Sequence, residues 1–280
     1  MLYICQKKGT SQGTTLLLRA EIYYGNTTVA QVITLFNQAG GVGKTTLTMN
    51  LGYHLAQRHH RVLLIDMDPQ ASLTTFMGLI PKELEETMYE AIVDESPLAI
   101  HQDIYGMDLA PTNINLSAAE MQLIGADMRD LRLREALEPV IEQYKFILID
   151  CPPSLGLLSY ISLVAATHVL VPIETHFKAF QGTDLLLTTL NRVRKKPNRK
   201  LAIAGFIPTR YDARNSQDTR TLNAIHQQLC DWGTIFPAIS RSTAFVDASE
   251  QQMPLAMYSP KHPSLTILDK IAQSLEELSK

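Results

Sequence analysis

The chain has 280 residues, of which 45% are hydrophobic and 19% are charged, and its formal net charge at pH 7 is −3. These values are typical of a folded globular protein and exclude a disordered, collagen-like or strongly basic chain. The three cysteines lie far apart in the sequence, and no apolar run approaches the roughly 20 residues of a membrane span. We therefore expect a cytoplasmic protein from a reducing compartment.

The chain divides into two parts of unequal regularity. Residues 1–28 are polar and irregular, and three interpretations of them stay open: an extra edge strand, a disordered arm, or an extension caused by a start codon placed too early. We expect a marginal N-terminal appendage. Residues 29–280 alternate regularly between apolar runs and helical patterns, which predicts a single domain.

Within that domain, the first apolar run, Val32–Phe36, predicts a buried strand, and a helix is predicted from Lys44 to about Arg58. Strands that are apolar throughout and alternate with helices indicate a parallel sheet covered on both faces. The predicted fold is therefore α/β: a doubly wound, mostly parallel sheet. Further strands are predicted at residues 61–65, 146–149, 169–173, 201–207 and 234–236, with helical patterns near residues 84–93, 117–125 and 131–143.

The loop after the first predicted strand suits a nucleotide phosphate. Phosphate binding needs converging backbone N–H groups, the N-terminus of a helix and a cation. Here the cation is Lys44, and the next residue offers a hydroxyl for Mg²⁺. Gln38 stands five positions before Gly43, so the ordinary pattern G-x-x-x-x-G-K-[ST] is not met. The residues expected to bind the phosphates of ATP are Gly40, Gly41, Val42, Gly43, Lys44, Thr45 and Thr46.

The segment from Ala39 to Thr46 resembles the deviant Walker A box of the ParA/MinD superfamily of P-loop NTPases, K-G-G-x-G-K-[ST]. Three more segments support this resemblance. Asp66–Gln70 is similar to the first switch, Ile147–Gly156 to the Walker B strand and second switch, and Tyr211–Arg214 to the Y-D-A-R segment of partition ParA proteins. The resemblance implies a slow, switch-type ATP hydrolase that binds ATP and Mg²⁺ and forms a homodimer around the nucleotide.

One position departs from the family pattern. The signature lysine, which reaches the partner's phosphates in an ATP-bound dimer, is replaced by Ala39. Three interpretations stay open: dimerisation is lost, an ordinary ParA was engineered from lysine to alanine, or another lysine takes over. The carboxysome-positioning McdA branch is similar to the third case, because it lacks this lysine and uses a distant one. That resemblance favours Lys178 as the lysine that contacts the nucleotide.

The resemblance also implies roles in hydrolysis, which needs a positioned water and neutralised charge on the γ-phosphate. Lys44 would neutralise the phosphate, and Asp68 would position the attacking water. Asp150, the Walker B carboxylate, would hold Mg²⁺ together with Thr45, and Asp66 would support the metal site without contacting the ion. For the adenine base, the resemblance implies the loop containing Thr209 and Arg210 and the turn containing Pro237.

Partners are implied in the same way. Arg214 and Arg241 match the arginines with which ParA proteins hold DNA without reading its sequence, so nucleoid association is expected. A ParB-like or McdB-like adaptor protein would stimulate hydrolysis. A separate basic run at residues 192–200 is typical of a solvated helix end. The missing lysine favours carboxysomes as the cargo, and plasmid or chromosome partition stays open as the alternative.

Two functions from other classes are alternatives to this hypothesis. A MinD-like membrane role would need a basic amphipathic helix at the C-terminus. An iron protein with a shared cluster would need a second cysteine near Cys151, and none stands at a cluster spacing. The C-terminal pattern instead predicts a helix packed on its own domain, with an apolar stripe formed by Leu265, Leu268, Ile271, Leu275 and Leu278.

Overall fold

The computed structural model describes residues 30–176 and 182–278, so the expected N-terminal appendage lies outside the described residues. These residues form a seven-stranded sheet in the order β3-β4-β2-β5-β1-β6-β7. All neighbouring strands are parallel except β3, which runs antiparallel to β4 at the edge. The strands are β1 (Gln31–Leu35), β2 (Val62–Asp66), β3 (His101–Ile104), β4 (Met107–Ala110), β5 (Phe146–Asp150), β6 (His168–Glu174) and β7 (Ala202–Thr209).

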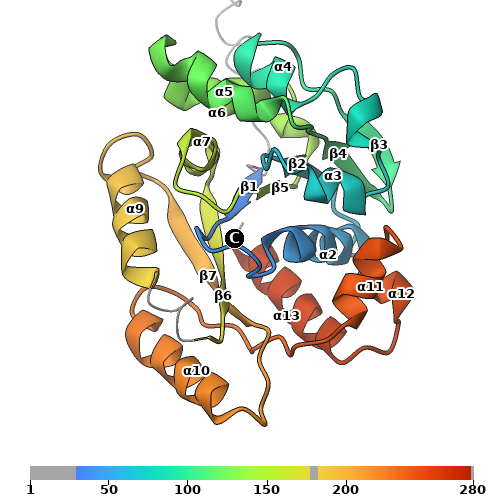
Figure 1. Cartoon of the computed structure of the whole chain (residues 1–280), viewed down its shortest axis with the longest axis vertical. Coiled ribbons are helices and arrows are strands. Elements are labelled where there is room, and N and C mark those ends of the chain that lie inside the picture. Colours follow the sequence, from blue (N-terminus) through green and yellow to red (C-terminus); the bar gives the residue numbers. More distant parts are fainter. Residues whose placement is uncertain (1–29, 177–181, 279–280) are drawn as a thin grey trace, which may run out of the picture.

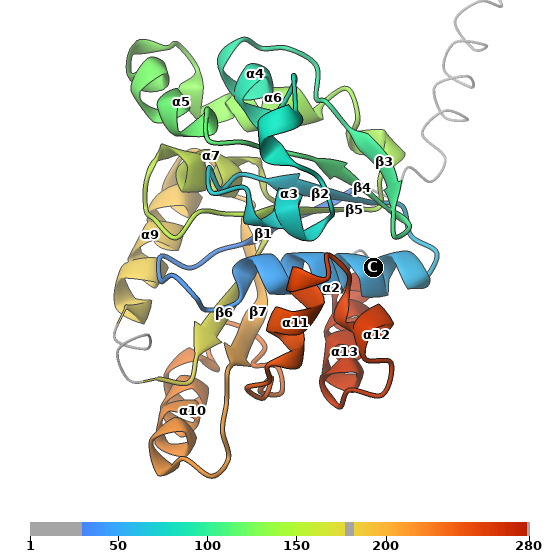
Figure 2. The same cartoon turned by 45° about the vertical axis from the view of Figure 1, so that its right-hand side comes forward.

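Helices cover both faces of this sheet (Figures 1 and 2). One hydrophobic core lies between the sheet and the first group of helices: α4 (Met88–Val93), α5 (Leu116–Gln122), α6 (Arg132–Leu137), α7 (Leu157–Ala165), α9 (Thr183–Lys195) and α10 (Ser216–Leu229). A second core lies between the other face and α2 (Lys44–Gln57), α3 (Ser72–Phe76), α11 (Ala244–Glu250), α12 (Leu255–Tyr258) and α13 (Ser264–Glu277).

The central strands explain why the sheet is covered on both sides. Every residue of β1, β2 and β5 is buried, as expected for parallel strands whose two faces both contact helices. The prediction of a doubly wound, mostly parallel α/β fold is therefore confirmed. The predicted short strand at residues 234–236 is present as an isolated bridge from Ile235 to Phe206 of β7.

The region between β2 and β5 differs from the prediction. Strands β3 and β4 form a hairpin that the sequence pattern did not indicate, because β3 is polar and half-exposed at the sheet edge. Its two-residue turn, Tyr105-Gly106, has positive φ at both positions, which is the conformation that hairpin turns favour. The helical pattern near residues 84–93 begins only at Met88, where Thr87 and Glu90 form a capping box.

The C-terminal helix packs on its own domain, as its apolar stripe predicts. Leu268, Ile271 and Leu275 are buried, and α13 lies along α2 on the outer side of the second core (Figure 2). Among the helices of the described residues, none has the length and apolar character needed to cross a membrane.

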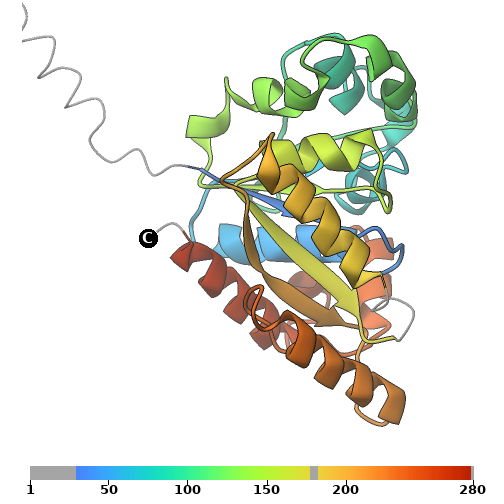
Figure 3. The ribbon, with the colours of Figure 1, turned by 90° about the vertical axis from the view of Figure 1, so that its left-hand side faces the viewer.

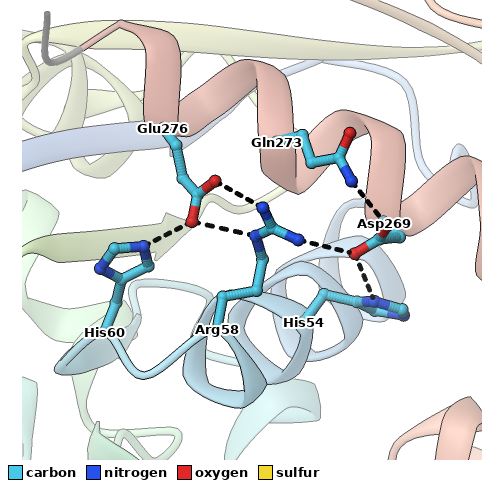
Figure 4. Close-up of polar contacts among 6 residues, drawn as sticks. All are labelled: His54, Arg58, His60, Asp269, Gln273 and Glu276. Atoms are coloured by element: carbon cyan, nitrogen blue, oxygen red, sulfur yellow. Dashed lines mark hydrogen bonds and ion pairs between the residues drawn. The ribbon is translucent and has the colours of Figure 1, made fainter.

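An ion-pair network joins the C-terminal end of α2 to α13 (Figure 4). Arg58 donates to both carboxylate oxygens of Glu276, at 2.9 and 2.8 Å, and to Asp269 at 3.3 Å. His60 contacts the same Glu276 carboxylate from the other side. The hydrogen bond from Arg58 lowers the pKa of Glu276 from 4.5 to about 2. The network thus holds the phosphate-loop helix against the last helix of the chain.

We expect Glu276→Gln to lower the free energy of unfolding by about 1 kcal/mol at pH 7, because it removes a two-point pairing with Arg58. A carboxylate whose pKa is lowered by folding stabilises the protein above its unfolded pKa and loses that contribution as the pH falls. The difference in the free energy of unfolding between parent and variant should therefore reach its largest value above about pH 5 and should shrink from pH 4.5 toward pH 2. Urea unfolding across this range measures it, with the exposed neighbour Glu277→Gln as the control; equal losses in both variants would contradict the assignment.

Candidate functional site

The loop between β1 and α2 is built to receive an anion at a helix N-terminus. Gly41 and Gly43 have φ values of +74° and +93°, a conformation that side chains other than glycine rarely adopt. Helix α2 begins at Lys44 with no side-chain cap and no acidic residue in its first turn. Its first N–H groups therefore need a partner from outside the helix, and the helix dipole favours a negative one.

Two polar side chains fix the position of this loop. Asn37 donates to the Pro172 carbonyl of β6 at 2.7 Å and accepts from the Ala39 N–H at 2.9 Å. Gln38 donates to the Gly182 carbonyl at 2.6 Å. Sequence reasoning did not single out either tether, although an asparagine directly after a buried strand and just before a glycine loop was a usable signal.

Lys44 folds back over the loop that precedes it. Its ammonium group donates to the Ala39 carbonyl at 3.0 Å, and the residue is only 6% exposed. Burial lowers the pKa of Lys44, whereas the charge of the nearby Asp150 opposes that shift. A buried cation beside an uncapped helix start provides the positive charge that a phosphate group requires.

Two carboxylates stand side by side where β2 and β5 end, because the sheet register pairs Asp66 with Asp150. Both are fully buried. Asp66 accepts hydrogen bonds from the N–H and hydroxyl of Thr74, both at 2.8 Å, and from the Asp68 N–H at 3.1 Å. Burial nevertheless raises the pKa of Asp66 to about 7. Asp66 thus anchors the segment that follows β2.

Asp150 has no such partners. Neither of its carboxylate oxygens has a partner with hydrogen-bond geometry, although the Thr45 hydroxyl lies near enough to oppose the shift of its pKa. Burial first, and then the charge of Asp66, raise the pKa of Asp150 well above its usual range. A buried carboxylate without a hydrogen bond is costly, so its position beside Lys44 and Thr45 fits a metal ion. No group of three or more His, Cys, Asp or Glu side chains in the described residues is arranged to hold one; phosphate and water oxygens would have to complete the coordination, as is usual for Mg²⁺.

Asp68 lies on the segment that Asp66 anchors. One of its carboxylate oxygens accepts from the Gln70 N–H at 3.0 Å, and the residue is 9% exposed. It is close enough to Lys44 for its charge to act on the pKa of that lysine. The structure therefore brings together the predicted catalytic and metal residues Lys44, Thr45, Asp66, Asp68 and Asp150.

A cavity of about 330 Å³ adjoins the loop on the side away from the carboxylates. Thr209 lines it and donates to the Val42 carbonyl at 2.9 Å. Arg210 also lines it, donates to the Gly41 carbonyl at 3.2 Å and pairs with Glu174. The cavity is thus tied directly to the phosphate loop. Sequence reasoning missed its apolar lining, because the residues come from two distant segments. The lining is formed by Leu47, Ile239, Phe245 and Val246.

The third residue expected at the base pocket does not take part in this lining. Pro237 is exposed and is not among the residues that line the cavity, and its place is taken by Ile239, two positions later. The remaining predicted nucleotide contact, Lys178, lies outside the described residues.

Of the two arginines assigned to DNA, Arg241 lines this cavity, and both lie near enough to Asp212 to act on its pKa. A parallel bridge joins Tyr211 to Ser240, and the Arg241 N–H donates to the Tyr211 carbonyl at 3.0 Å. The Arg214 side chain is 91% exposed and makes hydrogen bonds to both oxygens of Asp212. Those bonds lower the pKa of Asp212, and Arg241 adds a smaller effect in the same direction. The structure thus brings two arginines that are 27 positions apart in the sequence near the same carboxylate.

Comparison with known proteins agrees with this arrangement. A family model described as an AAA domain matches residues 30–203. The chromosome partitioning protein ParA of Caulobacter vibrioides is 36% identical over 237 residues, which cover 82% of this chain and 88% of that protein.

Solved structures give the same result. A cobyrinic acid a,c-diamide synthase from Mycobacterium smegmatis with bound ADP and magnesium is 30% identical, with a TM-score of 0.79 and coverage of 89% of this chain and 94% of that one. A Cyanothece McdA variant in complex with ATP is 25% identical, with a TM-score of 0.80 and coverage of 89% and 97%. The chain therefore belongs to the family that this model describes as an AAA domain, and to the ParA/MinD superfamily of ATPases.

Proposed function

We propose that this protein is an ATP-driven switch of the ParA type, which binds ATP with Mg²⁺, dimerises, and in that state holds DNA without reading its sequence. The observation that carries the proposal is the buried Asp150, whose oxygens lack partners, beside Lys44 and an uncapped helix start. ADP with magnesium and ATP are bound in the two similar solved structures.

Mg²⁺ would be held by Asp150 and the Thr45 hydroxyl, with phosphate and water oxygens as the other ligands. The ion, when bound, neutralises charge on the phosphate oxygens. Lys44 would leave the Ala39 carbonyl and turn to the phosphates, and backbone N–H groups from Gly40 to Thr46 would surround them. Asp66 would support the metal site by holding Asp68 in place, and Asp68 would orient the attacking water.

The adenine base would occupy the cavity lined by Leu47, Phe245 and Thr209. Arg210, tied to the Gly41 carbonyl, would lie at the edge of the bound nucleotide. Pro237, being exposed, would have at most an indirect role there.

Dimerisation needs a substitute for the signature lysine that Ala39 replaces, and we propose Lys178 for that role. We expect Lys178→Ala to abolish the ATP-dependent dimer, because the two sets of phosphates would then face each other without a bridging cation. Light scattering of the parent and of the variant, each with and without a non-hydrolysed ATP analogue, measures this. Lys82→Ala, an exposed lysine elsewhere, is the control; a dimer that persists in Lys178→Ala would contradict the role.

DNA binding would use Arg214 and Arg241. Contacts with phosphates weaken steeply with added salt, and each lost contact lowers the affinity at all sequences alike. We expect the double charge reversal Arg214→Glu/Arg241→Glu to weaken ATP-dependent binding to a duplex of random sequence at least tenfold. Fluorescence anisotropy at two salt concentrations measures it, and Lys82→Glu/Lys261→Glu gives the same change in net charge elsewhere on the surface.

Two cargoes are each favoured by one observation. The absence of the signature lysine favours carboxysomes, positioned with an McdB-like adaptor. The 36% identity to a chromosome partitioning ParA favours plasmid or chromosome DNA, positioned with a ParB-like adaptor. The test is ATP turnover with the purified protein of the neighbouring gene, since the true adaptor should accelerate hydrolysis and the other should not.

A further inference from the structure

A second positive surface lies at the far end of α9, and we call it the α9 basic surface. Six of the nine residues from 192 to 200 are lysine or arginine, and all six are exposed, although the whole chain has a net charge of −3. None of the ion pairs in the described residues uses any of them. The surface consists of Arg192, Arg194, Lys195, Lys196, Arg199 and Lys200.

Helix stability accounts for only part of this charge. Cations in the last turn of a helix are stabilised by about 0.3–1 kcal/mol through the helix dipole. Arg192, Arg194 and Lys195 lie in the last turn of α9. Arg199 and Lys200 lie beyond the end of the helix, in the connection to β7. The effect of the dipole falls off within the last turn, so their positive charge needs another reason.

The turn that carries these charges is fixed to the body of the protein. Asn198 is buried, and its amide donates to the carbonyls of Leu163, Val164 and Ala166 at 3.0, 3.2 and 2.6 Å. Leu163 and Val164 lie in the last turn of α7, and Ala166 follows its end; the Val164 carbonyl also accepts from Arg134 at 2.6 Å. A positive surface on an ordered turn loses less conformational entropy when a ligand binds than one on a free loop.

This surface is separate from the arginines assigned to DNA. Helix α9 runs antiparallel to the neighbouring strands. Its C-terminal end therefore lies where the parallel strands begin, and the phosphate loop lies where they end (Figure 3). Strand β7 has eight residues and leads from the end of α9 to the side of the sheet that carries the phosphate loop. A strand of this length spans about 26 Å. Lys200 precedes β7 and Arg214 follows it, so the two groups of cations lie at opposite ends of this strand.

The chemistry of the surface favours a polyanion over a membrane. A peripheral membrane surface combines cations with exposed apolar side chains. The exposed large apolar residue of α9, Leu185, lies in the first turn of the helix, away from the charged end. Cations closely spaced on an ordered surface, without apolar companions, match the regular phosphates of a nucleic-acid backbone.

We propose that the α9 basic surface is a second contact for the phosphate backbone of duplex DNA, available in the nucleotide-free protein. This inference rests on the proposed function, in which the chain binds DNA, and it adds a contact that does not depend on ATP. One molecule would then hold DNA weakly between cycles and could join two segments when the ATP-dependent surface is also engaged.

The experiment compares two triple variants of the full chain with equal change in charge. Lys195→Glu/Lys196→Glu/Lys200→Glu alters the α9 basic surface, and Lys82→Glu/Lys261→Glu/Lys270→Glu alters three exposed lysines elsewhere. Binding of nucleotide-free protein to a labelled 30-base-pair duplex of random sequence is measured by anisotropy over a salt series. We expect the first variant to bind at least tenfold more weakly, and its slope of log affinity against log salt to be shallower by about 2 to 3. The second variant should stay within about twofold of the parent.

Other outcomes would overturn the proposal. Unchanged binding by the first variant, or equal weakening of both, would show that this surface makes no DNA contact. Parent protein that binds vesicles of phosphatidylcholine and phosphatidylserine, or poly-glutamate, but not DNA, would assign the surface to another partner. Arg214→Glu/Arg241→Glu separates the two hypotheses: it should lose ATP-dependent binding and keep the nucleotide-free component. If nucleotide-free DNA binding does not depend on the α9 basic surface but ATP-dependent binding behaves as expected, this inference fails and the proposed function still holds.

Discussion

Replacing Asp150 with asparagine is expected to reduce ATP turnover at least 100-fold while leaving the nucleotide-free protein as stable as the parent or more stable. The carboxylate is fully buried and neither oxygen has a partner, so in the absence of ligand it costs free energy. Asparagine has nearly the same shape and no charge. It removes the cost of burying an unpaired charge, and it also removes the charge that would hold Mg²⁺. Phosphate release and urea unfolding in EDTA measure the two effects.

The neighbouring Asp66→Asn provides a contrast at the paired position. One oxygen of Asp66 accepts two hydrogen bonds from Thr74, and the other accepts one from the Asp68 N–H. An amide nitrogen in place of either oxygen would lose at least one of these bonds. We expect a loss of about 1–3 kcal/mol in the free energy of unfolding. An Asp150→Asn variant that unfolds as easily as Asp66→Asn, or that still turns over ATP, would contradict the assignment.

Replacing Asp68 with alanine is expected to abolish hydrolysis and to leave ATP affinity within about threefold of the parent. Asp68 does not line the cavity proposed for the base and makes no hydrogen bond to the phosphate loop, so the main binding contacts remain. The substitution slows the chemical step, because a water molecule must be oriented for the attack. Such positioning raises the rate by a factor of about 100 or more. Single-turnover hydrolysis and titration with a fluorescent ATP analogue measure the two quantities separately.

Asp68→Asn distinguishes chemistry from loop structure. The amide oxygen can still accept from the Gln70 N–H, as the carboxylate does at 3.0 Å, but the charge is gone. If Asp68 acts on the water, Asn is as inactive as Ala. Recovery of turnover in Asp68→Asn would show instead that the carboxylate only shapes the segment after β2.

Parts of the site that are continuous in the sequence were predictable from it. The loop from Gly40 to Thr46 lies between a fully apolar strand and a helix, and the observed helix begins at Lys44 as predicted. Asp66 and Asp150 each end an apolar strand, and parallel strands bring their carboxyl ends to one edge. For these residues the local sequence pattern and the tertiary structure favour the same conformation.

Parts that depend on contacts between distant segments were not predictable. Ile239 and Phe245 reach the cavity only because residues 239–241 pair beside Tyr211, and no periodicity in either segment indicates that pairing. Strand β3 is similar: its residues are polar and half-exposed, and its partner β4 determines its conformation. The different environments of Asp66 and Asp150 also needed the structure, because Thr74 satisfies one carboxylate and not the other.

The packing of α13 on α2 has a consequence for synthesis of the protein. The phosphate loop is among the first parts of the domain to be translated, but the helix behind it is held by Asp269 and Glu276 near the end of the chain. Residues 239–246, which complete the cavity, are also made late. A chain still on the ribosome therefore has a phosphate loop without the cavity lining from residues 239–246 and without the contacts between α2 and α13. We therefore expect nucleotide binding to begin only after α13 has been synthesised.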